Sequence, residues 1–205
     1  GHVRVGDVIV ALPSGKESTV QAIVTFEGEI ERADKGMAVT LTLTDEIDIS
    51  RGEMIVKKDN LPVSSQQFNA NVVWMHENEL EAGREYYIKQ GSKMTTGHAV
   101  SFEHRIDVNT LEHSAVSQLA LNEIGSVNFD VSETLHFDSY QDNHATGAFI
   151  IIDRLSNVTV GAGMICKALD GQSNGQYSAF EMEFNQLVRK HFPHWGAREI
   201  GKLLS

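Results

Sequence analysis

Short stretches in which apolar and polar residues alternate recur along most of the 205-residue chain. In one of them, Val127, Phe129 and Val131 alternate with polar residues, which predicts a half-buried strand with these three side chains in the core. The segment 37–43 alternates in the same way. Turn signals separate the stretches, and Leu12–Gly15 has proline and glycine where a type I turn favours them. The pattern predicts short strands along most of the chain, as in an all-β protein.

The stretch Ala145–Ile165 predicts two strands joined by a turn at Leu155–Asn157. Gly161 and Gly163 lie two residues apart in the second strand, so their missing side chains fall on one face of it. We expect a neighbouring backbone or a bulky ring to approach closely on that face. A further chain reversal is expected at Glu27–Glu29.

These motifs resemble, in the same order, the two barrels that follow the G domain in elongation-factor-like GTPases. Arg51-Gly52 before a predicted strand resembles the turn that precedes the last strand of the first barrel, and Ala145–Ile165 resembles the closing strands of the second. The resemblance implies two consecutive antiparallel β-barrels of the translation-factor GTPase type. Three stretches resemble, more narrowly, the large, GTP-hydrolysing subunit of bacterial sulfate adenylyltransferase: Leu12–Glu29, Leu43–Glu53 and Phe192–Arg198.

Pro62 marks the expected junction between the two barrels. Residues 1–62 are then the elongation-factor-like second-domain barrel, which the resemblance implies to be truncated at its N-terminus. Residues 63–168 are the third-domain barrel, and residues 169–205 are a linker and a C-terminal helical tail.

The tail differs in composition from the rest of the chain. Ser178 and Glu181 form a capping box that predicts the start of a helix, and Pro193 ends the pattern. The helix is expected to pack on a barrel or on a partner, because an apolar stripe follows at helical spacing: Phe180, Phe184, Leu187, Val188 and His191. Three residues near its end form a weak candidate partner interface, with ordinary packing as the alternative for the two rings: Phe192, Trp195 and Arg198.

The sequence lacks the phosphate-binding loop that a GTPase needs. That loop ends in Gly-Lys-Ser/Thr, whose hydroxyl holds magnesium, whereas here Gly15-Lys16 precedes Glu17 and Gly201-Lys202 precedes leucine. We therefore predict no catalytic residue and no cofactor in this chain, and leave open whether it is part of an enzyme. The resemblance implies that GTP and Mg bind in a G domain of the parent protein.

The composition limits which classes of partner the chain can bind and in which cellular compartment we expect it. The net charge of −11 argues against nucleic acid as the main partner, because affinity for phosphate backbones depends on lysine and arginine. No apolar run approaches the length of about 18 residues that a membrane span needs, and a single cysteine, Cys166, excludes an internal disulfide. We expect a cytoplasmic protein that binds no membrane, with Cys166 buried as a structural thiol.

The nine histidines show no spacing typical of metal ligands, so no metal site is predicted. Asp142-Asn143-His144 could form an acid–base couple in a loop. With no nucleophile arranged beside it, a surface loop is the better interpretation.

The resemblance implies that the chain is the C-terminal, non-catalytic part of the GTP-hydrolysing regulatory subunit of sulfate adenylyltransferase (ATP sulfurylase), which activates sulfate for sulfur assimilation. The implied partners are the catalytic subunit, which performs adenylyl transfer, and the parent's own G domain. The alternative is a tRNA- or ribosome-binding barrel module of a translation-factor GTPase, for which an electropositive groove would be the evidence. A third hypothesis, a free-standing enzyme that uses a histidine loop, would be favoured by a clustered His/Asp pocket.

Overall fold

The computed structural model describes residues 1–107, 110 and 112–169. Every regular element in this part of the chain is a β-strand, and the pairings between the named strands are antiparallel. The predicted all-β class is therefore confirmed. The predicted C-terminal helix lies outside the described residues. None of the described residues belongs to a helix that could cross a membrane.

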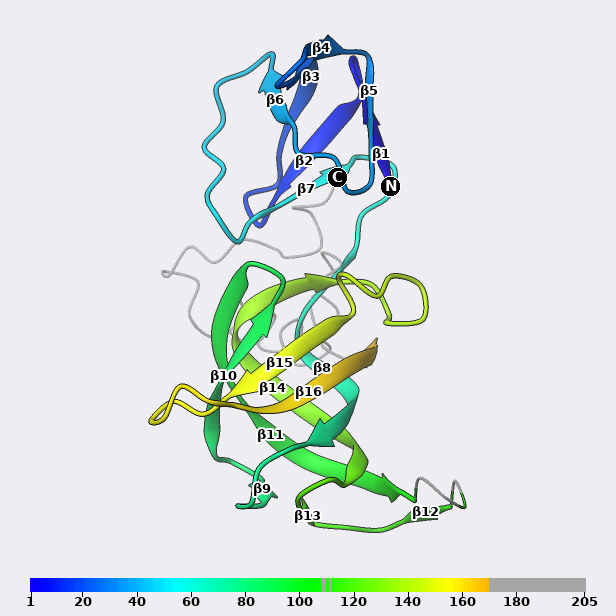
Figure 1. The fold of residues 1–205 in the computed structure, drawn as a ribbon, viewed down its shortest axis with the longest axis vertical. Helices are drawn as coiled ribbons and strands as arrows, with labels where there is room; N and C mark the ends of the chain where they lie inside the picture. The colour runs from blue at the N-terminus through cyan, green and yellow to red at the C-terminus, as the bar shows by residue number, and fades with distance from the viewer. Residues whose placement is uncertain (108–109, 111, 170–205) are drawn as a thin grey trace, which may run out of the picture.

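Residues 1–57 form the first group of strands, shown at the top of Figure 1. The order β4-β3-β2-β7, with β6 paired to β3, gives one sheet, and β1 and β5 form a separate ribbon. Ile9, Val20, Ile23 and Ala33 pack together between these elements. The strands are β1 (His2–Arg4), β2 (Val8–Leu12), β3 (Lys16–Thr25), β4 (Gly28–Ile30), β5 (Arg32–Asp34), β6 (Thr40–Leu43) and β7 (Met54–Lys57).

The second group is a closed barrel of six strands. Its order is β10-β15-β16-β8-β14-β11, and β11 pairs back to β10, so that the ring of hydrogen bonds has no open edge. Three short strands lie at its rim: β9 (Leu80–Glu81), β12 (His113–Ser114) and β13 (Gln118–Leu119). The barrel strands are β8 (Val63–Trp74), β10 (Glu85–Gln90), β11 (Lys93–Ile106), β14 (Ile124–Phe137), β15 (Ala148–Ile152) and β16 (Thr159–Ala168).

Aromatic rings fill the barrel interior. Phe68 stacks on Phe129 with ring centroids 5.7 Å apart, and it meets Phe149 edge to face at 5.4 Å. Val127, Phe129 and Val131 are all buried, which confirms the alternation predicted for that strand. Because inward and outward residues alternate along a strand, the outer side chains face solvent or a partner.

The two glycines of β16 have the role that their spacing predicts. A Cβ built on Gly163 would lie 2.2 Å from Cζ of Phe149, and one built on Gly161 would lie 3.0 Å from Cε3 of Trp74. Two large rings therefore occupy the space that side chains at 161 and 163 would need. The turn between β15 and β16 includes residues 154–156, as expected.

Three local expectations are wrong. Cys166 is exposed, because Gly163 and Ile165 face inward and the next residue must then face outward. The amide of Gly15 donates to the carbonyl of Ala11 at 2.8 Å, so that loop closes over five residues rather than the four of a type I turn. The strand expected over residues 37–43 covers only Thr40–Leu43.

Candidate functional site

The candidate interface residues predicted from sequence, Phe192, Trp195 and Arg198, lie outside the described residues. Two other regions combine polar side chains with an unusual geometry. One is a cavity between the first group of strands and the barrel, and the other is the turn that joins β15 to β16.

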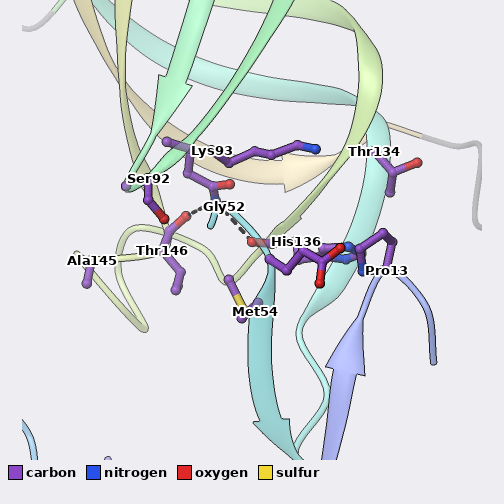
Figure 2. A pocket seen from close by; sticks show the side chains of 12 residues that line it. Pro13, Gly52, Met54, Ser92, Lys93, Thr134, His136, Ala145 and Thr146 are labelled. Atoms are coloured by element: carbon purple, nitrogen blue, oxygen red, sulfur yellow. Dashed lines mark hydrogen bonds between the residues drawn. The ribbon is translucent and has the colours of Figure 1, made fainter. Parts of the chain in front are cut away.

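The cavity has a volume of about 140 Å³ and is lined from both groups of strands, with Gly52 and Met54 on one side and Gln90, Lys93 and His136 on the other. Figure 2 shows Met54, Lys93 and His136 around it. At its edge the backbones approach closely, since a Cβ built on Gly52 would lie 3.5 Å from Cα of Lys93. Gly52 has a φ of +99°, a conformation that glycine adopts without steric cost. The predicted Arg51-Gly52 turn therefore lies against the hairpin between β10 and β11.

Beside this cavity, the side chain of Gln90 connects three segments of the barrel by hydrogen bonds. Its side chain is buried, and Nε2 donates to the carbonyl of His136 at 3.0 Å and to that of Thr146 at 2.5 Å. The end of β10 is thereby fixed to β14 and to the loop before β15. A buried amide that satisfies two carbonyls stabilises a single arrangement of these segments.

His136 is the main titratable group of the cavity. Its Nδ1 lies 2.8 Å from Oγ of Ser64, its cross-strand neighbour in β8. The other ring nitrogen, Nε2, is buried and has no hydrogen-bond partner. Burial lowers the pKa of His136 below its ordinary value, and the nearby charge of Lys93 lowers it further.

The Ser64–His136 pair does not have the arrangement of a hydrolase site. A serine nucleophile needs an imidazole base whose second nitrogen is oriented by a carboxylate, and here Nε2 of His136 has no partner. Lys93, the nearest cation identified, is already paired with Glu133. We conclude that the pair links β8 to β14 and that the cavity is a structural junction.

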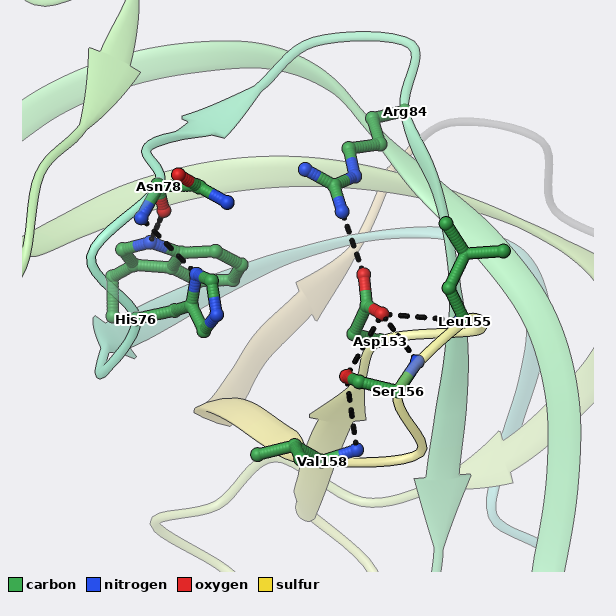
Figure 3. Close-up of polar contacts among 8 residues, drawn as sticks. His76, Asn78, Arg84, Asp153, Leu155, Ser156 and Val158 are labelled. Carbon is green, nitrogen blue, oxygen red and sulfur yellow. Dashed lines mark hydrogen bonds and ion pairs between the residues drawn. The ribbon is translucent and has the colours of Figure 1, made fainter.

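At the turn between β15 and β16, the carboxylate of Asp153 accepts four hydrogen bonds. Its Oδ1 accepts from the amides of Leu155 and Ser156, at 3.0 and 2.9 Å, and from Oγ of Ser156 at 2.9 Å. Its Oδ2 accepts from Nη2 of Arg84 at 2.6 Å. Figure 3 shows the carboxylate at the centre of these contacts. The bonds from the amide and hydroxyl of Ser156, followed by those from Leu155 and Arg84, lower the pKa of Asp153 to about 2.

The fixed turn presents an apolar tip. Leu155 is 92% exposed. The two arginines near it form ion pairs with neighbouring carboxylates. Arg84 pairs with Asp153 and lies over the ring of Tyr86 at 5.2 Å, and Arg154 pairs with Glu85. A rigid turn with one exposed leucine can contact another protein, but it holds no group that could do bond chemistry.

The loop Asp142-Asn143-His144 does not hold an acid–base couple. Asp142 accepts from Oγ of Ser139 at 2.7 Å, and His144 stacks on Tyr140 at 4.4 Å between ring centroids. The interpretation as a surface loop is confirmed by the exposure of residues 141, 142 and 144. In the described part of the chain no three histidine, cysteine or carboxylate side chains form a group that could hold a metal ion.

Comparison with known proteins finds relatives of this chain over nearly its whole length. The chain is 71% identical to sulfate adenylyltransferase subunit 1 of Colwellia psychrerythraea, over 98% of this chain and 43% of that protein. This chain is a relative of sulfate adenylyltransferase subunit 1. The proteins of the same name from Psychromonas ingrahamii and Shewanella woodyi are 58% and 57% identical, over 99% and 98% of this chain and 44% of each of those proteins. The chain thus spans less than half the length of these relatives.

The barrel also matches a family model. Residues 67–166 match the GTP-eEF1A C-terminal domain-like family, which confirms that this region of the chain resembles the translation-factor GTPases. The fold resembles the crystal structure of Sup35 in complex with GDP, with a TM-score of 0.74 and 18% identity, over 83% of this chain and 42% of that one. At that identity the similarity shows the fold alone.

Proposed function

We propose that this chain is the C-terminal, non-catalytic part of the GTP-hydrolysing regulatory subunit of sulfate adenylyltransferase, and that it serves sulfate activation for sulfur assimilation. The observation that carries the proposal is the 71% identity to sulfate adenylyltransferase subunit 1 across 98% of the chain. The sequence supports the non-catalytic assignment, because it contains no loop ending in Gly-Lys-Ser/Thr that could hold a nucleotide.

The proposal divides the chain into a second-domain barrel (residues 1–62), a third-domain barrel (63–168) and a tail (169–205). Two separate hydrophobic clusters support the first boundary, one within residues 9–33 and the other within residues 68–165. The partner is the catalytic subunit, as the words "subunit 1" in the relatives' names suggest. Under this proposal, GTP and Mg bind in the G domain of the parent protein. The protein functions in the cytoplasm, where an exposed thiol such as Cys166 stays reduced.

The proposed role is mechanical. The barrels dock the catalytic subunit and transmit the nucleotide-dependent movement of the G domain as rigid bodies. The junction supports this role, because Gln90 fixes three segments of the barrel on the side that faces the Arg51-Gly52 turn. The translation-factor alternative has weaker support, since a net charge of −11 disfavours binding to tRNA or ribosomal RNA.

Nucleotide binding tests the non-catalytic assignment. Titration of the purified chain with GTP in the presence of magnesium should give no calorimetric signal at micromolar concentrations, and incubation with ATP and sulfate should give no adenylylsulfate. Micromolar binding of GTP, or turnover by the chain alone, would contradict the assignment.

A further inference from the structure

The hairpin between β3 and β4 exposes a complete aromatic side chain. Phe26 is fully exposed, although a phenylalanine in this position gains nothing for the fold. Thr25 and Gly28 pair directly across the hairpin, so that only Phe26 and Glu27 form its loop. The predicted reversal is thus confirmed, shifted toward Phe26. Aromatic residues are enriched in the buried cores of protein interfaces.

The hairpin holds the ring in a defined place. Oγ1 of Thr25 donates to the carbonyl of Gly28 at 2.9 Å and accepts from the amide of Glu27 at 3.3 Å. Below the loop, Ile23 pairs with Ile30 and is buried in the core of the first group of strands. Because the loop is short and held by hydrogen bonds, it would lose little conformational entropy when it binds a partner.

Three carboxylates lie in or next to this hairpin. Glu27 is in its loop, Glu29 is in β4, and Glu31 directly follows β4. All three are exposed. None of them forms an ion pair with any residue that the structure describes. The nearest arginine along the chain, Arg32, is paired with Asp34.

This arrangement differs from the other exposed tip. Around Leu155 the charges are paired, Arg84 with Asp153 and Arg154 with Glu85. Around Phe26 the charges are of one sign and unpaired, which favours a partner of opposite charge. The carboxylates repel a nucleic acid and an anionic membrane surface, so the partner that fits is a protein.

We propose that the β3–β4 hairpin is a docking element, whose Phe26 ring enters an apolar pocket on another protein while Glu27, Glu29 and Glu31 contact lysine or arginine at the rim of that pocket. The inference rests on the proposed function, under which the other protein is the catalytic subunit of sulfate adenylyltransferase.

The test measures binding of the chain to the purified catalytic subunit by biolayer interferometry. Phe26→Ala should raise the Kd by about tenfold or more, as for a central aromatic contact, with an unchanged melting temperature because the ring touches nothing in the fold. Leu155→Ala, a truncation at an equally exposed tip, is the matched control and should change the Kd less than about twofold, since peripheral exposed residues contribute little.

The charges give a second readout. Replacing Glu27, Glu29 and Glu31 together by glutamine should flatten the dependence of Kd on salt, because exposed charge pairs are screened by ions. Binding of Phe26→Ala within about twofold of the wild type would overturn the inference and leave the proposed function intact. Failure of the wild-type chain to bind the catalytic subunit would instead overturn the partner assignment on which the inference rests.

Discussion

The ring of Phe149 occupies the space that a side chain at Gly163 would fill, since a Cβ built there would lie 2.2 Å from Cζ and 2.4 Å from Cε1 of the ring. The two residues are direct partners across β15 and β16. The ring cannot easily move away, because it also packs edge to face on Phe68 at 5.4 Å and on Phe129 at 5.6 Å. The glycine is therefore required by the packing of the barrel core rather than by its backbone.

Gly163→Ala should lower the free energy of unfolding by about 1 to 3 kcal/mol, the usual cost of an additional carbon in a filled core. Urea denaturation followed by fluorescence would measure it. Ala162→Ser, on the outer face of the same strand, is the control and should change stability by no more than about 0.5 kcal/mol.

A double mutant tests the cause of that loss. Phe149→Leu removes the ring that opposes residue 163. The double mutant should therefore lose less free energy of unfolding than the sum of the losses measured for Gly163→Ala and Phe149→Leu alone. Strict additivity would show that the loss arises elsewhere in the barrel.

Asp153 should make the stability of the barrel sensitive to acid. Its pKa falls from an ordinary 3.8 to about 2 in the folded chain, so its contribution is complete above the unfolded pKa and is lost as the pH falls from about 4 toward 2. Thermal melts of wild type and Asp153→Asn from pH 7 to pH 2.5 would measure this. The difference in melting temperature should be constant above about pH 5 and should shrink below about pH 4. A difference that does not change with pH would contradict the assignment.

His136 should make the stability of the barrel depend on pH nearer to neutrality. Because burial lowers its pKa in the folded chain below the ordinary 6.5, the unfolded chain binds this proton more readily, and stability should decrease as the pH falls below about 6.5. Replacing His136 by glutamine should reduce that decrease. Urea midpoints of the two proteins at pH 7.5 and pH 5.5 would test it, and parallel pH dependences would show that this imidazole does not titrate differently on unfolding.

The sequence predicts the features of this fold that depend on local pattern. Alternation locates the buried face of β14, and the spacing of Gly161 and Gly163 predicts the close approach of rings. Residues that act across long stretches of chain give no such signal. Gln90 meets Thr146 because β10 pairs with β15, which lies far along the chain, and nothing near Gln90 in the sequence indicates it.

The candidate site also has features that the local sequence indicates and others that it does not. Asp153 followed by Ser156 at a predicted turn is a local pattern that could have indicated the network at that turn. The exposure of Phe26 could not be predicted, because an apolar residue between two strands reads equally well as core. The predicted interface of Phe192, Trp195 and Arg198 stays a prediction, since it lies outside the described residues.

If this chain carries a docking surface for the catalytic subunit, the two purified proteins should form a complex in the absence of nucleotide. Sedimentation velocity of an equimolar mixture of the two purified proteins, without nucleotide, tests it most directly. We expect a single boundary that contains both proteins and sediments faster than either alone. Two boundaries with the sedimentation coefficients of the separate proteins, at concentrations well above micromolar, would contradict it.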